Sequence, residues 1–332
     1  TFNVDSTLYE YYQRCQEYLL EPVVLNMSDT LFRMAGERQD ERMQAVAIAT
    51  QLDYYYFQGT NEDSVIHYTN KVKEFAKATH QPKYYYFAWA NRLITYYLKT
   101  SRTNIALYEV QNMLKEAQEE DDKTGLSRCY NIMSQIYTIK RFDSMAFEWR
   151  LKEIELTEKY KIENYNISQT YAQIANYYIN QKKQKEALAA VEKAIATANS
   201  STQQISAKLE FVNYYSKFGD FQAAEKLLKE CQAAFEQDKR LESIKKRLYN
   251  IECLYYQQTK QYQKALEAAK MQEKEERRLS ESILSSSHYR TQGEIYQKMG
   301  NMNLAVKYLQ MYINADDSLK IANEQVASSE FA

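Results

Sequence analysis

The sequence predicts an all-α fold of about eight helix pairs, repeated with a period near 40 residues. The chain has 332 residues but only six Gly and two Pro, and a β-sandwich or barrel of this length would need many more turn residues. An α/β fold would need short Val/Ile-rich runs between Gly-bearing turns, and the sequence has none. Ala, Leu, Glu, Lys and Gln, which are strong helix formers, fill the chain instead.

The repeat is marked by a small residue near the start of the second helix of each pair. These anchors are Val65, Ala106, Ala146, Ala187, Ala224, Ala265 and Ala305, with separations of 41, 40, 41, 37, 41 and 40 residues. A tyrosine stands nine residues before each anchor, at Tyr56, Tyr97, Tyr137, Tyr178, Tyr215, Tyr256 and Tyr296. Since 31 of 332 residues are Tyr, seven coincidences at one offset indicate a true repeat.

The last repeat has the clearest spacing, with Gly293, Tyr296, Gly300 and Ala305 in order. This spacing resembles the tetratricopeptide (TPR) consensus, and the resemblance covers nearly the whole chain. It implies a right-handed α–α superhelix in which the first helix of each pair lines a concave groove. Small residues would let the two helices of a pair approach closely, and Gly would serve the short turn. The longer period and the missing Pro of the family repeat predict longer helices with Pro-free connections.

The repeat register assigns a residue range to every helix. The expected pairs are 5–20 with 23–36, 40–58 with 61–79, 82–99 with 102–120, 123–140 with 142–161, 165–181 with 183–198, 202–218 with 220–237, 240–258 with 260–279, and 283–299 with 301–321. Pro22 and Pro82 suit helix starts, where a missing N–H costs nothing. We therefore expect one repeat array over 1–321, with the first pair as a degenerate cap, and a helical tail over 322–332 that leads to a missing C-terminal region.

Composition and motifs exclude several classes of function. A formal net charge of −1 gives no electrostatic footprint for nucleic acid, and no apolar run approaches the roughly 20 residues of a membrane span. The three histidines, His67, His80 and His288, lack metal-ligand spacing, and neither a phosphate-binding loop nor a nucleophile motif is present. The acidic run at 119–122 is interpreted as a solvated loop. We therefore expect no catalytic residue, no metal and no cofactor.

Two of the four cysteines allow a sharper hypothesis. Cys231 and Cys253 occupy small-residue positions that pack together in this architecture, so their thiols could be neighbours and could form a disulfide in an oxidising compartment. The favoured alternative is two buried small side chains.

The groove implied by the resemblance can be described residue by residue. Stepping through the register puts these side chains on its wall: Tyr54, Asn91, Arg128, Asn131, Gln135, Asn176, Asn213, Arg247 and Asn250. An amide offers a donor and an acceptor together, which matches a peptide backbone, and Arg offers a fork for a carboxylate. The expected partner is a peptide or protein segment, or a polar small ligand. The alternatives are an ordinary solvated helix face and, for the aromatic residues, packing between repeats.

The tail, which reads DDSL at 316–319 and SSEFA at 328–332, suggests a cellular context. After Tyr-rich repeats near 40 residues, it resembles the extracytoplasmic TPR sensor regions of Bacteroidetes membrane-bound two-component and transcriptional regulators. That resemblance implies a periplasmic, non-catalytic sensor region, anchored in the membrane only through the missing C-terminal segment, with any kinase in another domain. The alternative is a cytoplasmic peptide receptor or scaffold. A homodimer is compatible with either.

Overall fold

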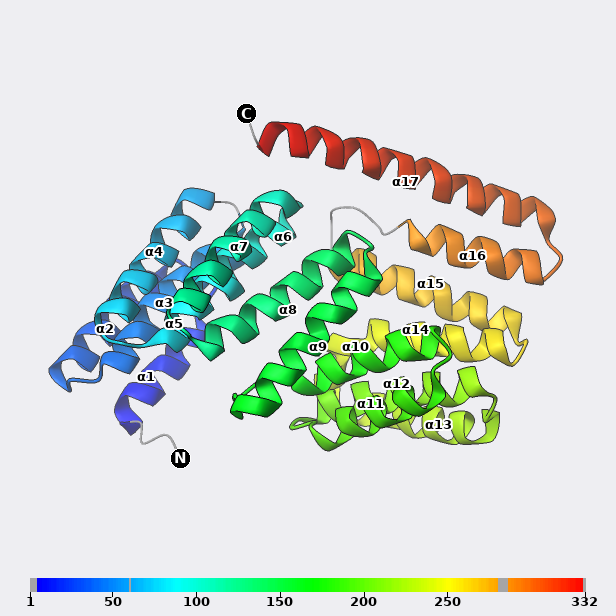
Figure 1. Cartoon of the computed structure of the whole chain (residues 1–332), viewed down its shortest axis with the longest axis horizontal. Coiled ribbons are helices and arrows are strands. Elements are labelled where there is room, and N and C mark those ends of the chain that lie inside the picture. Colours follow the sequence, from blue (N-terminus) through cyan, green and yellow to red (C-terminus); the bar gives the residue numbers. More distant parts are fainter. Residues whose placement is uncertain (1–4, 60, 280–285, 331–332) are drawn as a thin grey trace. The chain divides into compact units, whose positions relative to one another are not determined.

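A computed structural model describes residues 5–59, 61–279 and 286–330 (Figure 1). Every regular element in these ranges is a helix, so the all-α prediction is confirmed for the described residues. The expected helix start at 283 and the last two residues of the expected tail, 331–332, lie outside them. No helix within the described ranges combines the length and the apolar character that crossing a membrane requires.

The helices group into two compact units, which are described separately. The first unit contains α1 (Ser6–Glu17), α2 (Val23–Glu37), α3 (Glu41–Gln58), α4 (Glu62–Ala78), α5 (Pro82–Ala88), the π-helix η1 (Trp89–Ile94), α6 (Thr95–Lys99), α7 (Thr103–Glu119), α8 (Lys123–Ile139) and α9 (Asp143–Tyr160). The helix bounds follow the expected pairs closely. The interruption by η1 within the third pair was not anticipated.

The second unit has the same construction. It contains α10 (Ile167–Asn180), α11 (Gln184–Ala196), α12 (Ser201–Phe218), α13 (Phe221–Gln237), the 3₁₀ helix η2 (Lys239–Ile244), α14 (Lys245–Gln258), α15 (Tyr262–Leu279), α16 (Ser287–Lys298) and α17 (Met302–Glu330) as far as Gln325. The helix α17 is longer than the expected 301–321. A single array over 1–321 stays a prediction.

Local sequence explains where many of the helices begin. Asp40, Asn61, Asp122, Ser200 and Asp220 each precede a helix, and the side chain of each accepts a hydrogen bond from a backbone N–H of the first turn. Pro82 is the first residue of α5, as expected, and Pro22 lies immediately before α2.

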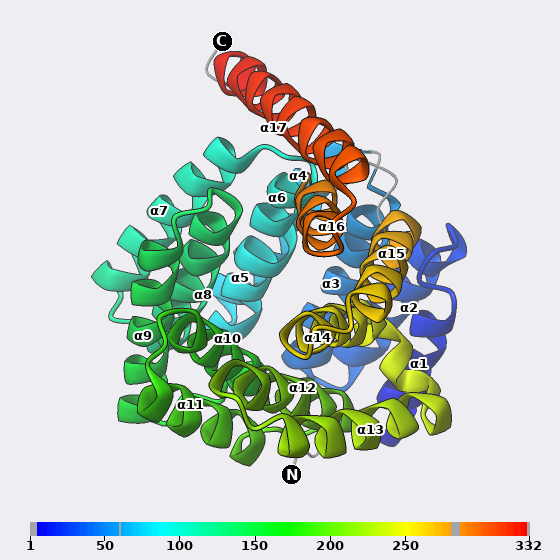
Figure 2. The same cartoon turned by 90° about the vertical axis from the view of Figure 1, so that its right-hand side faces the viewer.

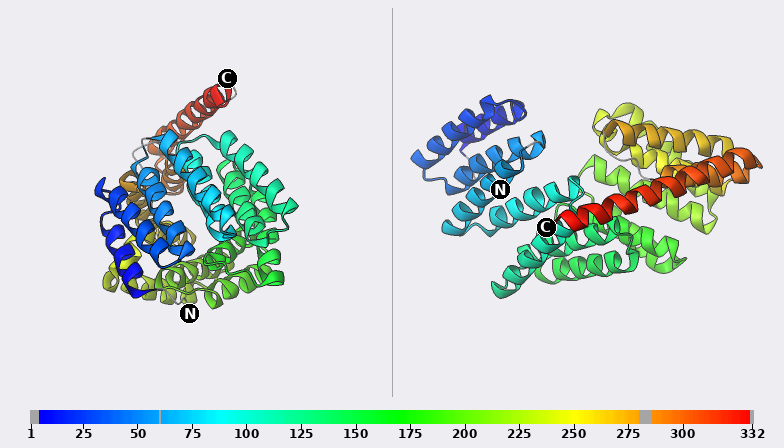
Figure 3. Two further views of the ribbon diagram at one scale, coloured as in Figure 1. Left: turned by 90° about the vertical axis from the view of Figure 1, so that its left-hand side faces the viewer. Right: turned by 90° about the horizontal axis from the view of Figure 1, so that it is seen from above.

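Each unit has two layers. We call the first helices of the pairs the A layer (α3, α5–η1–α6 and α8 in the first unit; α10, α12 and α14 in the second) and their partners the B layer. Successive A helices approach each other directly. In the B layer, long side chains bridge the gap, as Lys77 of α4 does to Glu116 of α7 at 3.3 Å. Because successive A helices lie closer together than successive B helices, the A layer is on the inner side of each unit. Figure 2 shows this for α12 and α14 against α13, and Figure 3 lets the helix order be followed by colour.

The anchors and their tyrosines form the repeating core. All seven anchors are buried, six at 0% exposure and Ala305 at 2%. Tyr56, Tyr97 and Tyr296 are also buried, and the other four tyrosines of the set are half-buried. The small anchor therefore sits where two helices cross, and the tyrosine fills the adjacent groove.

A glycine shows how close the helices of a pair come. A Cβ on Gly293 of α16 would lie 2.9 Å from Cγ of Leu309 and 3.2 Å from its backbone N in α17. The expectation that small residues permit close approach is met at this position.

We predict that Gly293→Ala lowers the free energy of unfolding by about 2 kcal/mol, because the added methyl group overpacks the α16–α17 contact. Urea unfolding followed by circular dichroism measures the change. The matched control is Gly36→Ala in α2, where a Cβ meets only the end of the flexible Gln44 side chain. Alanine should be tolerated or slightly favourable there. Equal losses at both sites would contradict the overpacking explanation.

The turns inside the pairs share one backbone conformation. From the second pair onward, each turn has one residue with positive φ: Gly59, Ser101, Arg141, Lys182, Gly219, Lys260 and Gly300. Glycine adopts this region without penalty, whereas other L-residues pay roughly 1–2 kcal/mol. Four of the seven turns therefore hold a residue that is poorly suited to its conformation.

We predict that Lys182→Gly raises the free energy of unfolding by about 0.5–1 kcal/mol, because it relieves an exposed left-handed residue. The reciprocal control is Gly219→Ala, at the same repeat position with φ +90° and no neighbouring atom within 4 Å. This substitution should lower the free energy of unfolding by about 1 kcal/mol through backbone conformation alone. Denaturant unfolding measures both, and a loss at Lys182→Gly would overturn the interpretation.

Candidate functional site

The A layers carry all nine of the predicted groove residues. In the first unit these are Tyr54 on α3, Asn91 on η1, and Arg128, Asn131 and Gln135 on α8. In the second unit they are Asn176 on α10, Asn213 on α12, and Arg247 and Asn250 on α14. The structure brings several of them together within each unit, and their surroundings differ in charge.

The second unit has a closed polar network around one carboxylate. Glu210 of α12 is only 2% exposed. Its Oε2 accepts from Arg247 Nη2 at 2.8 Å, and its Oε1 accepts from Nδ2 of Asn213 at 2.7 Å and of Asn176 at 3.2 Å. Three predicted groove residues are therefore committed to one buried charge. The main role of this buried carboxylate is to stabilise the fold, because removal of the Arg247 cation would leave its negative charge unpaired.

The first unit has a more open chain of polar contacts. Arg92 Nε donates to Oδ1 of Asp53 at 2.5 Å, and each of these two side chains is 16% exposed. Arg92 Nη1 also donates to the backbone oxygen of Asn91 at 2.9 Å, and Nη1 of Arg128 donates to Oδ1 of Asn91. Asn91 thus joins two guanidinium groups. Burial raises the pKa of the Asp53 carboxyl, an effect that the hydrogen bond from Arg92 opposes.

The π-helix η1 positions the side chains of this series of polar contacts. One extra residue per turn changes the direction of Asn91 and Arg92 relative to a regular helix, and such bulges are frequent at functional sites. Trp89 fixes the start of η1, because its Nε1 donates to Glu109 at 2.7 Å and Lys73 Nζ lies 3.3 Å from its ring centre. Arg92 is further enclosed by the ring of Phe87, 4.5 Å from its guanidinium carbon.

Arg128 has an unusual environment for a charged side chain. It is half-buried, its Nε is buried without an acceptor, and its one hydrogen bond in the described structure goes to the neutral amide of Asn91. It forms no ion pair with a carboxylate of the described residues. Burial lowers the pKa of its guanidinium. The charge of Arg128 is therefore uncompensated in the first unit.

The remaining predicted residues vary in availability. Gln135 is exposed and donates to Asn131 Oδ1 at 2.6 Å, and Asn131 donates to both oxygens of the buried Glu153 at 3.2 Å. Asn250 is exposed. Tyr54 is half-buried and packs against the core of the first two pairs, with its ring 5.0 Å from that of Tyr55. Tyr54 therefore contributes mainly to packing.

Sequence reasoning missed the acidic members of these networks. Asp53, Glu153 and Glu210, together with Arg92, were not among the expected groove residues. A signal existed for Glu210, because it stands between Leu209 and the pair Phe211 and Val212 in an apolar stretch of the sequence. A charged residue at such a position indicates a buried ion pair.

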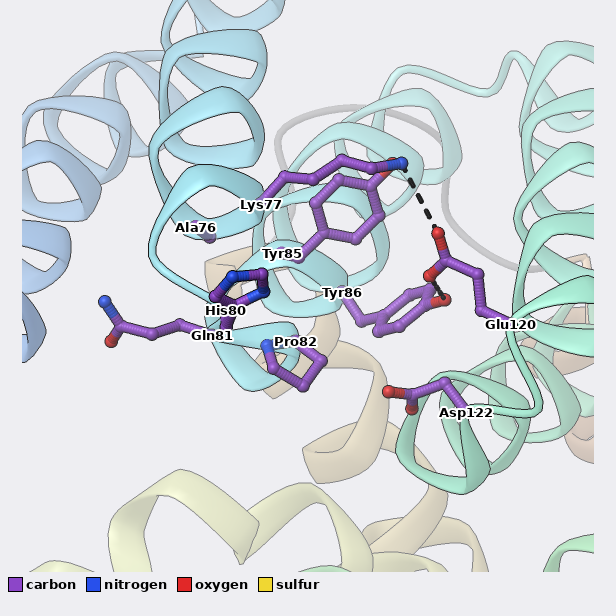
Figure 4. Close-up of a pocket in the computed structure, with 9 residues that line it drawn as sticks. All are labelled: Ala76, Lys77, His80, Gln81, Pro82, Tyr85, Tyr86, Glu120 and Asp122. Carbon is purple, nitrogen blue, oxygen red and sulfur yellow. Dashed lines mark hydrogen bonds and ion pairs between the residues drawn. The ribbon is translucent and has the colours of Figure 1, made fainter.

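A separate hollow of about 380 Å³ lies in the first unit, between the end of α4, the start of α5 and the α7–α8 turn (Figure 4). Tyr85 and Tyr86 form its aromatic wall. Its charged groups are paired: Lys77 Nζ lies 3.4 Å from Glu120 Oε1, and the side chain of Asp122 accepts from the backbone N of Gly125 at 2.7 Å. Because of these contacts, we interpret the polar side chains that line the hollow as stabilising the fold.

Packing accounts for His67, His288 and the four cysteines, and all four cysteines are buried. His288 is buried and its Nε2 contacts Oε2 of Glu276, and His67 packs edge-on against Tyr68. Cys231 and Cys253 are free thiols in different core clusters, so the structure contains no disulfide between them. Burial raises the pKa of Cys231 to about 12 and that of Cys253 to about 11. Among the described residues, no three metal-ligating side chains gather at one point.

Comparison with known proteins supports the fold. No protein-family model and no curated protein matches the sequence. Among solved structures, the chain is similar to NprR in complex with its cognate peptide NprX, with a TM-score of 0.56 and 14% identity over 81% of this chain and 78% of that one. It is also similar to a Rap protein complexed with Competence and Sporulation Factor, with a TM-score of 0.56 and 16% identity over 96% and 89%.

A third similar structure is the apo form of the quorum sensor NprR from B. thuringiensis, with a TM-score of 0.52 and 14% identity over 94% of this chain and 99% of that one. At these identities the similarity establishes a shared helical-repeat fold. The resemblance to tetratricopeptide repeats is therefore supported at the level of the fold.

We predict different effects on stability for substitutions of the two arginines. Arg247→Gln should lower the free energy of unfolding by about 3 kcal/mol, because it leaves buried Glu210 without a cation. Arg128→Gln should leave it unchanged or raise it by up to about 1 kcal/mol, because it removes a charge that has no counter-ion and keeps an amide beside Asn91. Urea unfolding of the ligand-free protein measures both. A large loss at Arg128→Gln would show that Arg128 has a structural role.

Proposed function

We propose that the chain is a non-catalytic receptor module that binds an extended peptide along the A layer of its first unit. The observation that carries this proposal is the uncompensated charge of Arg128, which contacts the amide of Asn91 and lies on the same helix, α8, as the linked amides of Asn131 and Gln135. A structural role alone does not explain why a guanidinium is kept half-buried without a counter-ion, because desolvating a charge is costly. A ligand that pairs with it removes this cost.

The amides suit a peptide for a simple chemical reason. An extended backbone presents N–H donors and C=O acceptors in alternation, and a side-chain amide can satisfy both. Gln135 is exposed, so its amide can exchange its hydrogen bond with Asn131 for one to a ligand at little cost. The fold shared with NprR, whose structure holds its cognate peptide, supports the proposal that this chain binds a peptide.

We further propose that this module is the extracytoplasmic sensor region of a membrane-anchored regulator. The support is the resemblance of the tail and of the long Tyr-rich repeats to such regions. A cytoplasmic peptide receptor or scaffold is the alternative, and the same A layer would serve it. The cell fraction in which the natural protein occurs distinguishes the two.

The test is the retention of peptides from a randomised decapeptide library on the immobilised protein. We expect the wild-type chain to retain a defined subset of sequences. Gln135→Ala should weaken the binding of retained peptides about fivefold, the equivalent of one hydrogen bond of about 1 kcal/mol.

The matched control is Gln263→Ala on α15, an exposed B-layer glutamine that also makes a contact within its own helix, to Glu267. This variant should bind the retained peptides with the same affinities as the wild type. Retention of no peptide by the wild-type chain, or an equal loss for both variants, would refute the proposed binding surface.

A further inference from the structure

We infer that the peptide bound in the first unit presents a carboxylate group to Arg128, which is the anchor of the site. This inference rests on the proposed function and adds the chemical class of the ligand. It comes from comparing Arg128 with the arginine at the same repeat position in the second unit.

Arg128 and Arg247 are equivalent residues. Each lies 18 positions before its anchor, Ala146 or Ala265, on the A helix of its pair. Each guanidinium contacts the side chain found 37 positions earlier, on the preceding A helix, and each has a buried Nε without an acceptor. The A layer therefore builds the same arginine site twice.

The two sites differ in what the preceding helix supplies. For Arg247 it supplies the carboxylate of Glu210, whose Oε2 lies 2.8 Å from Nη2. For Arg128 it supplies only the amide of Asn91, which accepts from Nη1. Nη2 of Arg128 has no partner in the described structure and is not among the buried unpartnered atoms, so it is not fully sealed from solvent. A ligand carboxylate at Nη2 would take the place that Glu210 fills in the second unit.

Neighbouring charges favour a single negative group. The contact chain of the first unit contains Asp53, Arg92, Asn91 and Arg128, with two guanidinium groups and one carboxylate. Arg92 is already paired with Asp53 at 2.5 Å, so one positive charge remains. A carboxylate carries one negative charge and two oxygens that match the guanidinium fork, whereas a phosphate near pH 7 would bring a charge excess.

Two sources can supply this carboxylate, namely the C-terminus of the peptide or an Asp or Glu side chain. Three randomised decapeptide libraries separate them. The first has a free C-terminus and no acidic residue, the second is C-terminally amidated and contains Asp and Glu, and the third is amidated without acidic residues. Each is applied to the immobilised wild-type chain and to the variants Arg128→Gln, Asn91→Glu and Arg33→Gln.

We expect the wild type to retain peptides of the first or second library at least tenfold more than those of the third. Arg128→Gln should abolish this preference because it removes the charge. Asn91→Glu should abolish it by a different route, since the new carboxylate reproduces the Glu210 arrangement and fills the site from within. Arg33→Gln, an exposed arginine of α2 in the same unit, should keep the preference.

The outcomes separate the inference from the proposed function. Retention of the third library at the level of the other two would overturn the carboxylate inference and leave peptide binding standing. A preference that survives both Arg128→Gln and Asn91→Glu would place the carboxylate elsewhere and also overturn the inference. Retention of no library by the wild type would overturn both proposals. Circular dichroism of each variant confirms that it is folded before binding is measured.

Discussion

Close approach between paired and successive helices is the constraint on which the rest of the structure depends. The anchors are small and almost fully buried, and Gly293 lies so near Leu309 that even a methyl group would clash. Because backbones come close at these points, large side chains must occupy the spaces to either side. The seven register tyrosines, which are all buried or half-buried, occupy them. The packing geometry thus accounts for these seven of the 31 tyrosines.

The same close packing determines the chemistry of the A layer. Polar side chains on adjacent A helices are partly withdrawn from water, so each needs a partner. Asp53 with Arg92, and Glu210 with Arg247, meet this requirement by ion pairs between successive helices. Arg128 meets it only in part, through one amide. A repeat architecture makes this difference informative, because the second unit provides an internal reference for the first.

One of the two irregular helical elements contacts Arg128. The π-helix η1 interrupts the third A helix and carries both Asn91 and Arg92, and Trp89 anchors its first turn through Glu109 and Lys73. The seventh pair also deviates, with the 3₁₀ helix η2 before α14, but there the cap residue Asp238 binds Arg240 at the surface. Only the first of these irregular elements places polar groups beside an uncompensated charge.

The sequence by itself determined the all-α class, the helix pairs and the register. Anchor spacing, tyrosine offset and scarce Gly and Pro were sufficient, because a repeat multiplies weak local preferences into a strong pattern. The tertiary structure decided which groove residues are available. Glu210 engages the side chains of Asn176, Asn213 and Arg247, and Tyr54 packs against the core. Arg128 keeps an Nη2 that has no partner in the described structure. Whether a charge is balanced depends on a side chain 37 residues away on another helix, and this pairing depends on packing that periodicity does not encode.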